Sequence, residues 1–159
     1  MQLCRLVYFS KYNINTRGND VTSDLKQILA ISIRNNSDRG ITGGLVFNRK
    51  FFVQALEGEH AVVTQTFARI NSDPRHKDIV IAEMGSVSER LFGAWAMGYA
   101  GKTALFNKLC VEHGHAGEFD PKNMSGSDLT AFILALVTHE ERFVSPKRTG
   151  SSLERGDVS

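Results

Sequence analysis

The fold of this chain is constrained most by the order in which its hydrophobic pattern switches between the period of a strand and the period of a helix. The pattern predicts a strand, a helix, two strands, a second helix and a further strand. In the first segment, Leu3–Phe9, side chains of a predicted strand alternate between its two faces, so that Leu6 and Tyr8 share one face while Val7 and Phe9 share the other. Because both faces carry apolar side chains, the sheet that contains this strand needs a cover on each side.

The first helix-like segment begins at Asp20, a residue type that caps helices, and it has a second acid in its first turn. Its inward stripe keeps the i, i+3, i+4, i+7 spacing through Leu25, Ile28, Leu29 and Ser32. We expect this helix to end near Asn35 and Asn36, which leaves polar groups at the end of the stripe.

Residues 41–47 and 51–58 are apolar runs on either side of a short polar turn at 48–50, which predicts an antiparallel hairpin. In its second strand, Phe52, Gln54 and Leu56 share one face. A second amphipathic helix follows through Val63, Phe67 and Ile70 and should stop at Asp73-Pro74. Strands are expected at 79–84 and, from the alternation, at 95–99.

This order predicts an α+β, ferredoxin-like βαββαβ(β) fold with two helices on one face of a mixed sheet, plus C-terminal helices. We expect a domain over residues 1–101, a helical extension over 102–143 and a polar, disordered tail over 144–159. The extension contains helix candidates at 103–110 and 127–143. The apolar stripe of the second candidate suits either the uncovered sheet face or a partner protein.

Composition excludes several classes of protein. The net charge is +2, from 19 Lys and Arg against 17 Asp and Glu, and 42% of the 159 residues are hydrophobic. This balance is typical of a globular chain and argues against direct nucleic-acid binding. No apolar run is long enough to span a membrane, and Cys4 and Cys110 are too few for a disulfide framework. We therefore expect a cytoplasmic protein.

Three polar residues do not fit a plain apolar core. Gln54 lies between Phe52 and Leu56 on a face assigned to the interior, where an unpaired amide would cost about 1–3 kcal/mol. Tyr8 is its natural partner if the first and third strands are neighbours, and Asn36 ends the polar side of the first helix. The three residues form either a ligand pocket or a buried hydrogen-bond network, and periodicity alone leaves both possible.

Other candidate sites are weaker. Asp73-Pro-Arg75-His76 has the donors to hold a phosphate, although loop charges of this kind are more often simply solvated. Cys110, His113 and His115 have soft donors but no evident fourth ligand, so we predict no metal site. No nucleotide-binding loop, nucleophile elbow or zinc-protease motif is present. We therefore predict that the chain is not an enzyme and has no catalytic residues.

Taken together, the motifs resemble the BLUF domain, a flavin-based sensor of blue light. The resemblance covers about residues 1–101, and its motifs follow in the expected order. They are Tyr8 in LVYFS, Ser32-Ile-Arg-Asn-Asn36 before Gly40-Ile-Thr-Gly, Phe51-Phe-Val-Gln54-Ala-Leu-Glu-Gly58, Asp73-Pro-Arg-His76 and Trp95-Ala-Met97.

The resemblance implies FAD, bound noncovalently between the two helices. Tyr8, Gln54 and Asn36 would surround the reactive edge of its ring, with Asn36 on a ring carbonyl and Gln54 between Tyr8 and the ring. The other implied cofactor-binding residues are Ile28, Ser32, Phe52 and Ile70 around the ring, and Asp73, Arg75 and His76 toward the ribityl chain and phosphate. Asn35 stands where many relatives have a ring-flanking histidine, a departure from the family pattern.

The implied function is light sensing, with Tyr8 and Gln54 as the photochemical pair. Trp95 and Met97 are expected on the same face as Gln54, from which they would relay the signal. The expected partners are a separate effector protein, either a cyclic-dinucleotide enzyme or a transcription regulator, and further copies of the chain. The alternative is a non-photochemical ferredoxin-like binding or interaction module. The colour of the purified protein distinguishes the two.

Overall fold

The computed structural model describes residues 2–14, 20–113 and 118–144. Their elements are β1 (Leu3–Tyr12), α1 (Val21–Arg39), β2 (Thr42–Phe47), β3 (Phe51–Glu59), α2 (His60–Asn71), β4 (His76–Ser86), β5 (Gly98–Ala100), α3 (Ala104–Glu112), the 3₁₀ turn η1 (Pro121–Asn123) and α4 (Gly126–Val144). The predicted tail, apart from the last residue of α4, lies outside these residues, and so does His115.

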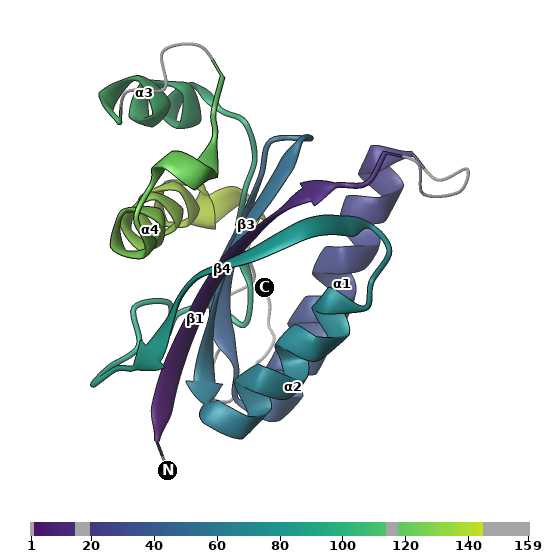
Figure 1. Cartoon of the computed structure of the whole chain (residues 1–159), viewed down its shortest axis with the longest axis vertical. Helices are drawn as coiled ribbons and strands as arrows, with labels where there is room; N and C mark the ends of the chain where they lie inside the picture. Colours follow the sequence, from purple (N-terminus) through teal and green to yellow (C-terminus); the bar gives the residue numbers. More distant parts are fainter. Residues whose placement is uncertain (1, 15–19, 114–117, 145–159) are drawn as a thin grey trace.

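The strands form one five-stranded mixed sheet in the order β4-β1-β3-β2-β5. Helices α1 and α2 lie on one side of this sheet, and α3 and α4 on the other (Figure 1). β1 pairs antiparallel with both β3 and β4, β2 pairs antiparallel with β3, and only β5 runs parallel to its neighbour β2. The predicted α+β, ferredoxin-like order is therefore confirmed. The register places Tyr8 directly opposite Gln54 at the centre of the sheet.

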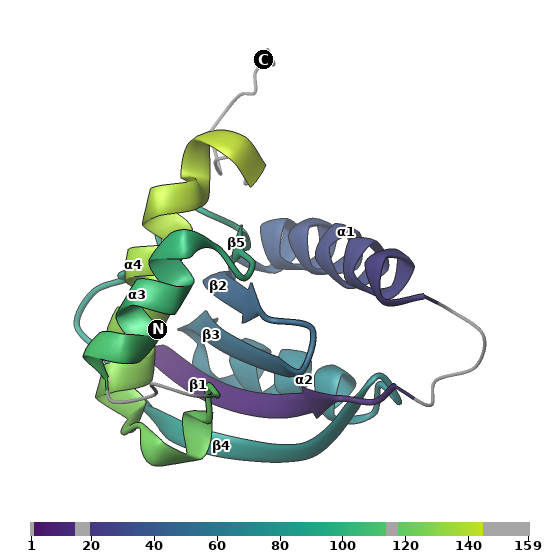
Figure 2. The ribbon, with the colours of Figure 1, turned by 90° about the horizontal axis from the view of Figure 1, so that it is seen from above.

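Helices α1 and α2 both cover one face of the sheet, as predicted (Figure 2). The core beneath them contains Leu6, Tyr8, Ile28, Ile41, Leu45, Phe47, Phe52, Leu56, Val63 and Met97. The period-two alternation of β1 and β3 delivers Leu6, Tyr8, Phe52 and Leu56 to this side. Asp20 caps α1, because its side chain accepts a hydrogen bond from the Ser23 backbone N–H at 2.7 Å.

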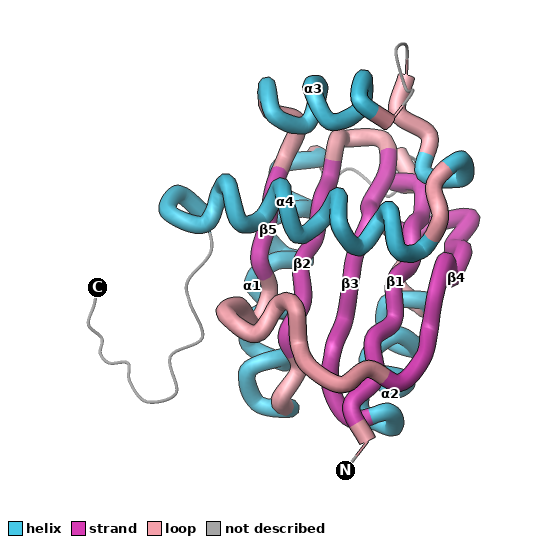
Figure 3. Tube along the Cα trace, turned by 90° about the vertical axis from the view of Figure 1, so that its left-hand side faces the viewer, coloured by secondary structure: helices cyan, strands magenta, loops and turns pink. Residues whose placement is uncertain are grey.

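The opposite face is covered by the C-terminal helices, with α4 lying across the strands (Figure 3). Its stripe is buried against the sheet, through Leu129, Phe132, Ile133, Leu136 and Val137. Gly44 and Gly98, paired on β2 and β5, allow this close approach: a Cβ on Gly44 would lie 2.9 Å from Ile133 Cγ2. The apolar stripe therefore serves as the missing cover and is not free for a partner.

Helix α1 continues past its expected end at Asn35 and Asn36 and stops at Arg39. The reason lies in the backbone. Gly40 adopts φ 72°, a left-handed conformation that glycine reaches without strain, and its N–H bonds to the Asn36 carbonyl. Asn36 therefore lies in the last turn of the helix, where its backbone carbonyl accepts the capping bond.

The fifth strand is shorter than expected and begins later. β5 covers Gly98–Ala100, whereas the alternation predicted a strand from Trp95. Trp95 lies in an irregular segment, where its carbonyl accepts a hydrogen bond from the Gly43 N–H at 3.2 Å. Alternation is a reliable guide to side-chain direction only within a regular strand, and here the strand has not yet begun.

Within the described residues, no helix is long and apolar enough to cross a bilayer. In the same part of the chain, no three His, Cys, Asp or Glu side chains come together as a metal site would require. Cys110 is buried in the core beneath α4, where burial raises the pKa of its thiol.

Candidate flavin-binding site

A pocket opens between α1 and α2 above the centre of the sheet. It is lined by Tyr8 of β1, Ile28, Ile31, Ser32, Asn35 and Asn36 of α1, Leu45 of β2, Gln54 and Leu56 of β3, Thr66, Arg69 and Ile70 of α2, and Asp73, Arg75 and His76 at the start of β4. Apart from Phe52, the predicted photochemical and cofactor-binding residues all line this one pocket.

Tyr8 and Gln54 form the floor. Tyr8 Oη donates a hydrogen bond to Gln54 Oε1, and Gln54 Nε2 donates to the Met97 sulfur at 3.4 Å. Both side chains are buried, Tyr8 completely. Burial, with a smaller contribution from the Asp73 charge, raises the pKa of Tyr8 above its usual range. The phenol therefore keeps its proton and acts as a neutral donor in an ordered chain of hydrogen bonds.

Asn36 closes the pocket at the end of α1. Its side chain is buried, and Nδ2 donates to the backbone carbonyl of Ala96 at 2.8 Å. This bond ties α1 to the segment that precedes β5. Because this bond uses the amide nitrogen of Asn36, the amide oxygen can accept a hydrogen bond from another group.

His76 lies deeper than its place in a loop motif suggests. Its ring nitrogen Nδ1 is 2.7 Å from Ser10 Oγ, and its ring lies 4.4 Å from that of Phe52. Burial lowers the pKa of His76 to about 4; the Asp73 charge opposes this effect and the Arg75 charge adds to it. His76 is therefore neutral at pH 7, and positive charge at this end of the pocket comes from Arg69 and Arg75.

This burial predicts a dependence of stability on pH. The unfolded histidine takes up a proton near pH 6.5, whereas the folded one does so only near pH 4, so acid favours the unfolded chain. We expect His76 to remove about 2 kcal/mol from the unfolding free energy between pH 7 and pH 5. Urea denaturation at both pH values measures the loss. His76→Gln should lack this part of the pH dependence; an identical dependence in the variant would contradict the assignment.

Arg75 and Asp73 form an ion pair at the mouth of the pocket. Arg75 Nη2 lies 2.7 Å from Asp73 Oδ2, and Nη1 donates to Gln27 Oε1 of α1 at 3.1 Å. Burial alone would raise the pKa of Asp73, but the hydrogen bonds and charge of Arg75 outweigh it and the net pKa is lowered. The guanidinium is thus fixed between α1 and the turn before β4, with its charge largely balanced.

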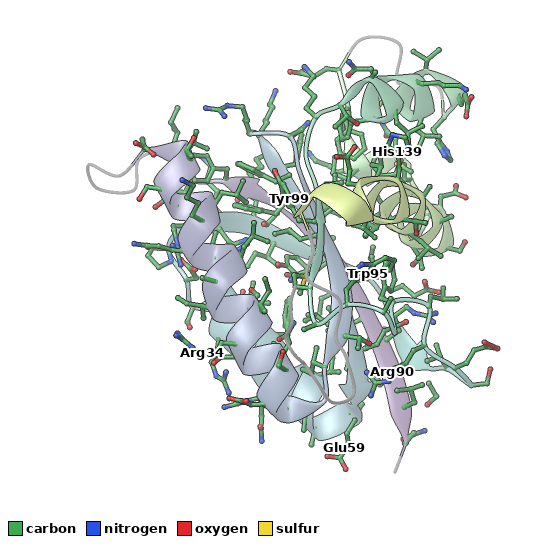
Figure 4. The ribbon with its side chains drawn as sticks, turned by 180° about the vertical axis from the view of Figure 1, so that it is seen from behind. Arg34, Glu59, Arg90, Trp95, Tyr99 and His139 are labelled. Atoms are coloured by element: carbon green, nitrogen blue, oxygen red, sulfur yellow. The ribbon has the colours of Figure 1, made fainter. Side chains whose placement is uncertain are left out.

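Two predicted residues lie elsewhere than expected. Phe52 is fully buried beneath the pocket, where its ring stacks on Phe47 at 4.4 Å, and it is not part of the lining. Trp95 does not share a face with Gln54: it belongs to the core on the α4 side of the sheet (Figure 4). Met97 belongs to the core beneath α1 and α2 and lies beside Gln54. The indole Nε1 of Trp95 is buried without a hydrogen-bond partner in the described part of the chain.

Sequence reasoning missed five lining residues: Ile31, Leu45, Leu56, Thr66 and Arg69. Two signals were available. Leu56 follows Gln54 by two residues on the same face of β3, and Leu45 of β2 is the register partner of Gln54. Thr66 precedes Ile70 by one helical turn. Ile31 precedes Asn35 by one helical turn in the same way. Arg69 had no comparable signal.

The residues present fit a flavin. Ile28 and Ile70 offer apolar contacts from the two helices to a planar ring, while the Gln54 and Asn36 amides offer polar contacts to ring carbonyls and nitrogens. Arg69 and Arg75 at the other end suit a phosphate. The fold and the pocket together define a ferredoxin-like domain that can hold an aromatic cofactor between two helices and a sheet.

Comparison with known proteins agrees. The family model described as sensors of blue-light using FAD matches residues 3–98, and the chain belongs to this BLUF family. Among solved structures, the photo-activated state of BlsA aligns with TM-score 0.77 and 30% identity, covering 85% of this chain and 94% of that one. The dark state of the BLUF protein BlrB aligns with TM-score 0.68 and 28% identity, over 84% and 96% of the two chains.

The curated relatives are much longer proteins. The photoactivated adenylate cyclase subunit alpha of Euglena gracilis is 38% identical over 71 residues, which are 45% of this chain but 7% of the relative. The chain thus spans under a tenth of that relative's length.

Proposed function

We propose that this chain is a blue-light photoreceptor that binds FAD noncovalently in the pocket between α1 and α2 and signals to a separate protein. The observation that carries the proposal is the buried hydrogen-bond chain from Tyr8 through Gln54 to Met97 on the pocket floor. Asn36 and Gln54 would hold the ring edge, with Ile28, Ser32, Asn35 and Ile70 around it. Asp73, Arg75 and His76 would line the side toward the ribityl chain, where Arg69 adds charge.

Bound FAD, after absorbing blue light, supplies an oxidant strong enough to take an electron from a phenol. Tyr8 is the donor, and its Oη proton leaves along the hydrogen bond to Gln54 Oε1. When the electron returns, Tyr8 takes a proton back from Gln54, so that no proton is gained or lost, and Gln54 is left in a different rotamer or tautomer. No covalent bond between heavy atoms changes, so the dark state should return without a reductant.

A rotated Gln54 amide turns Nε2 toward Tyr8 and Oε1 toward Met97. The N–H···S hydrogen bond to Met97 is then lost, because a carbonyl oxygen cannot donate to sulfur. Met97 directly precedes β5, which is paired with β2 and covered by α4. A shift of Met97 therefore reaches the C-terminal helices, and Trp95, packed in the α4-side core, lies on this route.

The relatives support an effector with catalytic activity. Among the solved structures similar to this chain is a bacterial light-regulated adenylyl cyclase, 29% identical, of which the chain covers 32%. We propose that the chain acts as a sensor and that catalysis belongs to its partner.

The test uses the purified chain supplemented with FAD. We expect a yellow protein whose flavin absorption shifts to longer wavelength under blue light and returns in darkness with no added reductant. A protein that stays colourless after supplementation would contradict the proposal and favour a non-photochemical binding module. Bleaching of the flavin without a red shift would contradict the Tyr8–Gln54 mechanism.

Cofactor retention should depend more on Asn36 than on Arg75. Asn36→Ala removes a buried amide and leaves the Ala96 carbonyl without its donor, for which we expect about a five- to hundredfold loss of FAD affinity. Arg75→Ala should cost less, since its charge is already balanced by Asp73. Titration of the apo-protein with FAD measures both; an equal or larger loss for Arg75→Ala would contradict this placement.

A further inference from the structure

Beyond the pocket, β3 carries a second buried polar group. Glu57 follows Gln54 by three residues, so its side chain lies on the other side of the sheet, and it is completely buried. Its carboxylate accepts four hydrogen bonds: from Arg5 Nε at 2.9 Å, Thr42 Oγ1 at 3.1 Å, Leu91 N at 2.8 Å and Phe92 N at 2.9 Å. Each oxygen has two donors, so no acceptor site is left for a substrate.

Two of the four donors are backbone N–H groups of the segment 87–97, which connects β4 to β5. Arginine side chains reinforce the attachment. Arg90 Nη1 donates to Thr42 Oγ1 at 2.8 Å and to the Glu57 carbonyl at 3.2 Å, and Arg5 Nη2 donates to the Glu89 carbonyl at 3.1 Å. Glu57 thus anchors the middle of this segment, at Leu91 and Phe92, to the centre of the sheet.

The same segment ends beside the flavin pocket, where it contacts two of the lining residues. The Ala96 carbonyl accepts from Asn36 and the Met97 sulfur accepts from Gln54, while the Trp95 N–H donates to the Phe92 carbonyl at 3.1 Å in the turn between. Strand β3 therefore holds the segment on both faces, through Gln54 on the pocket side and Glu57 on the other. The two attachments differ in strength, because hydrogen bonds to a buried carboxylate are stronger than one weak N–H···S contact.

We propose that Glu57 is a positioning residue for the photocycle: it fixes residues 91–92, so that Ala96 and Met97 meet Asn36 and Gln54 and the light-driven movement is confined to residues 93–97. This deepens the proposed function and rests on it. Weakening the anchor lets the whole segment move when Gln54 reorganises, so the balance between the lit and dark arrangements changes although no residue of the pocket has been altered.

Glu57→Gln tests the proposal, because the amide keeps the shape but its nitrogen cannot accept from a backbone N–H. On the apo-protein, hydrogen exchange at Leu91 and Phe92 should accelerate about tenfold, as expected for a lost charge-assisted hydrogen bond. With FAD bound, the red shift should persist while its dark recovery rate changes about fivefold or more. Arg5→Gln should change the hydrogen exchange and the dark recovery rate in the same direction but by a smaller factor. If Glu57→Gln does not fold, Arg5→Gln is measured in its place.

Phe106→Leu in the core beneath α3 is the matched control: it lowers stability at a ring that packs on Phe119 and Phe132, and we expect wild-type recovery. Unchanged hydrogen exchange at residues 91–97 in Glu57→Gln would show that Glu57 does not anchor the segment. A dark recovery rate equal to that of the control would show that Glu57 has no role in the photocycle. If the wild type shows no reversible red shift, the proposed function fails, while exchange in the apo-protein still decides whether Glu57 anchors the segment.

Discussion

Gln54→Leu should abolish the light-induced red shift while the protein still binds FAD. Leucine fills much of the same volume on the pocket floor but cannot accept from Tyr8 or donate to Met97, so nothing remains to reorganise after the electron returns. Tyr8→Phe should have the same outcome for another reason: without Oη, no proton accompanies the electron. Difference spectra before and after blue illumination measure both effects.

Matched controls separate this chemistry from general damage. Gln65→Leu makes the same change at an exposed position of α2, and Tyr12→Phe removes a hydroxyl that donates to Asp24 at 2.7 Å, on the same strand as Tyr8. Both controls should keep a reversible red shift. A normal shift in Gln54→Leu would refute the mechanism, and a normal shift in Tyr8→Phe would refute the role of Tyr8 as electron donor.

Phe132→Ala should lower the free energy of unfolding by about 3–5 kcal/mol, because it leaves a cavity in the core between α4 and the sheet. The Phe132 ring is 1% exposed, stacks on Phe119 at 5.2 Å and meets Phe106 edge-on at 5.5 Å. Urea denaturation followed by circular dichroism measures the loss.

Val111→Ala, at a position that is 62% exposed on α3, is the control and should change stability by about 0.5 kcal/mol or less. An equal effect of the two substitutions would mean that α4 contributes little to the fold.

By the same reasoning, a chain truncated after Gly101 exposes the whole apolar face of the sheet. It should lose solubility even though every pocket residue is present.

Local sequence patterns predicted much of the fold. The alternation in β1 and β3 assigned Tyr8 and Gln54 to one face, and the register confirms that they lie opposite each other. Asp20 was predicted as a helix cap and is one. These predictions succeed because side-chain direction within a regular element depends only on neighbouring residues in the chain.

The position of Trp95, the depth of His76 and the anchor at Glu57 were decided by the tertiary structure. Trp95 faces α4 because the segment before β5 is irregular, and the shape of that segment is set by hydrogen bonds from Leu91 and Phe92 to a carboxylate more than thirty residues earlier. Periodicity cannot encode such contacts, since they join parts of the chain that meet only after the sheet has formed. The sequence by itself therefore determined the order of the elements and the faces of the regular strands. Tertiary packing decided where the irregular segments place their side chains, because a backbone outside a helix or strand takes its conformation from distant hydrogen-bond partners.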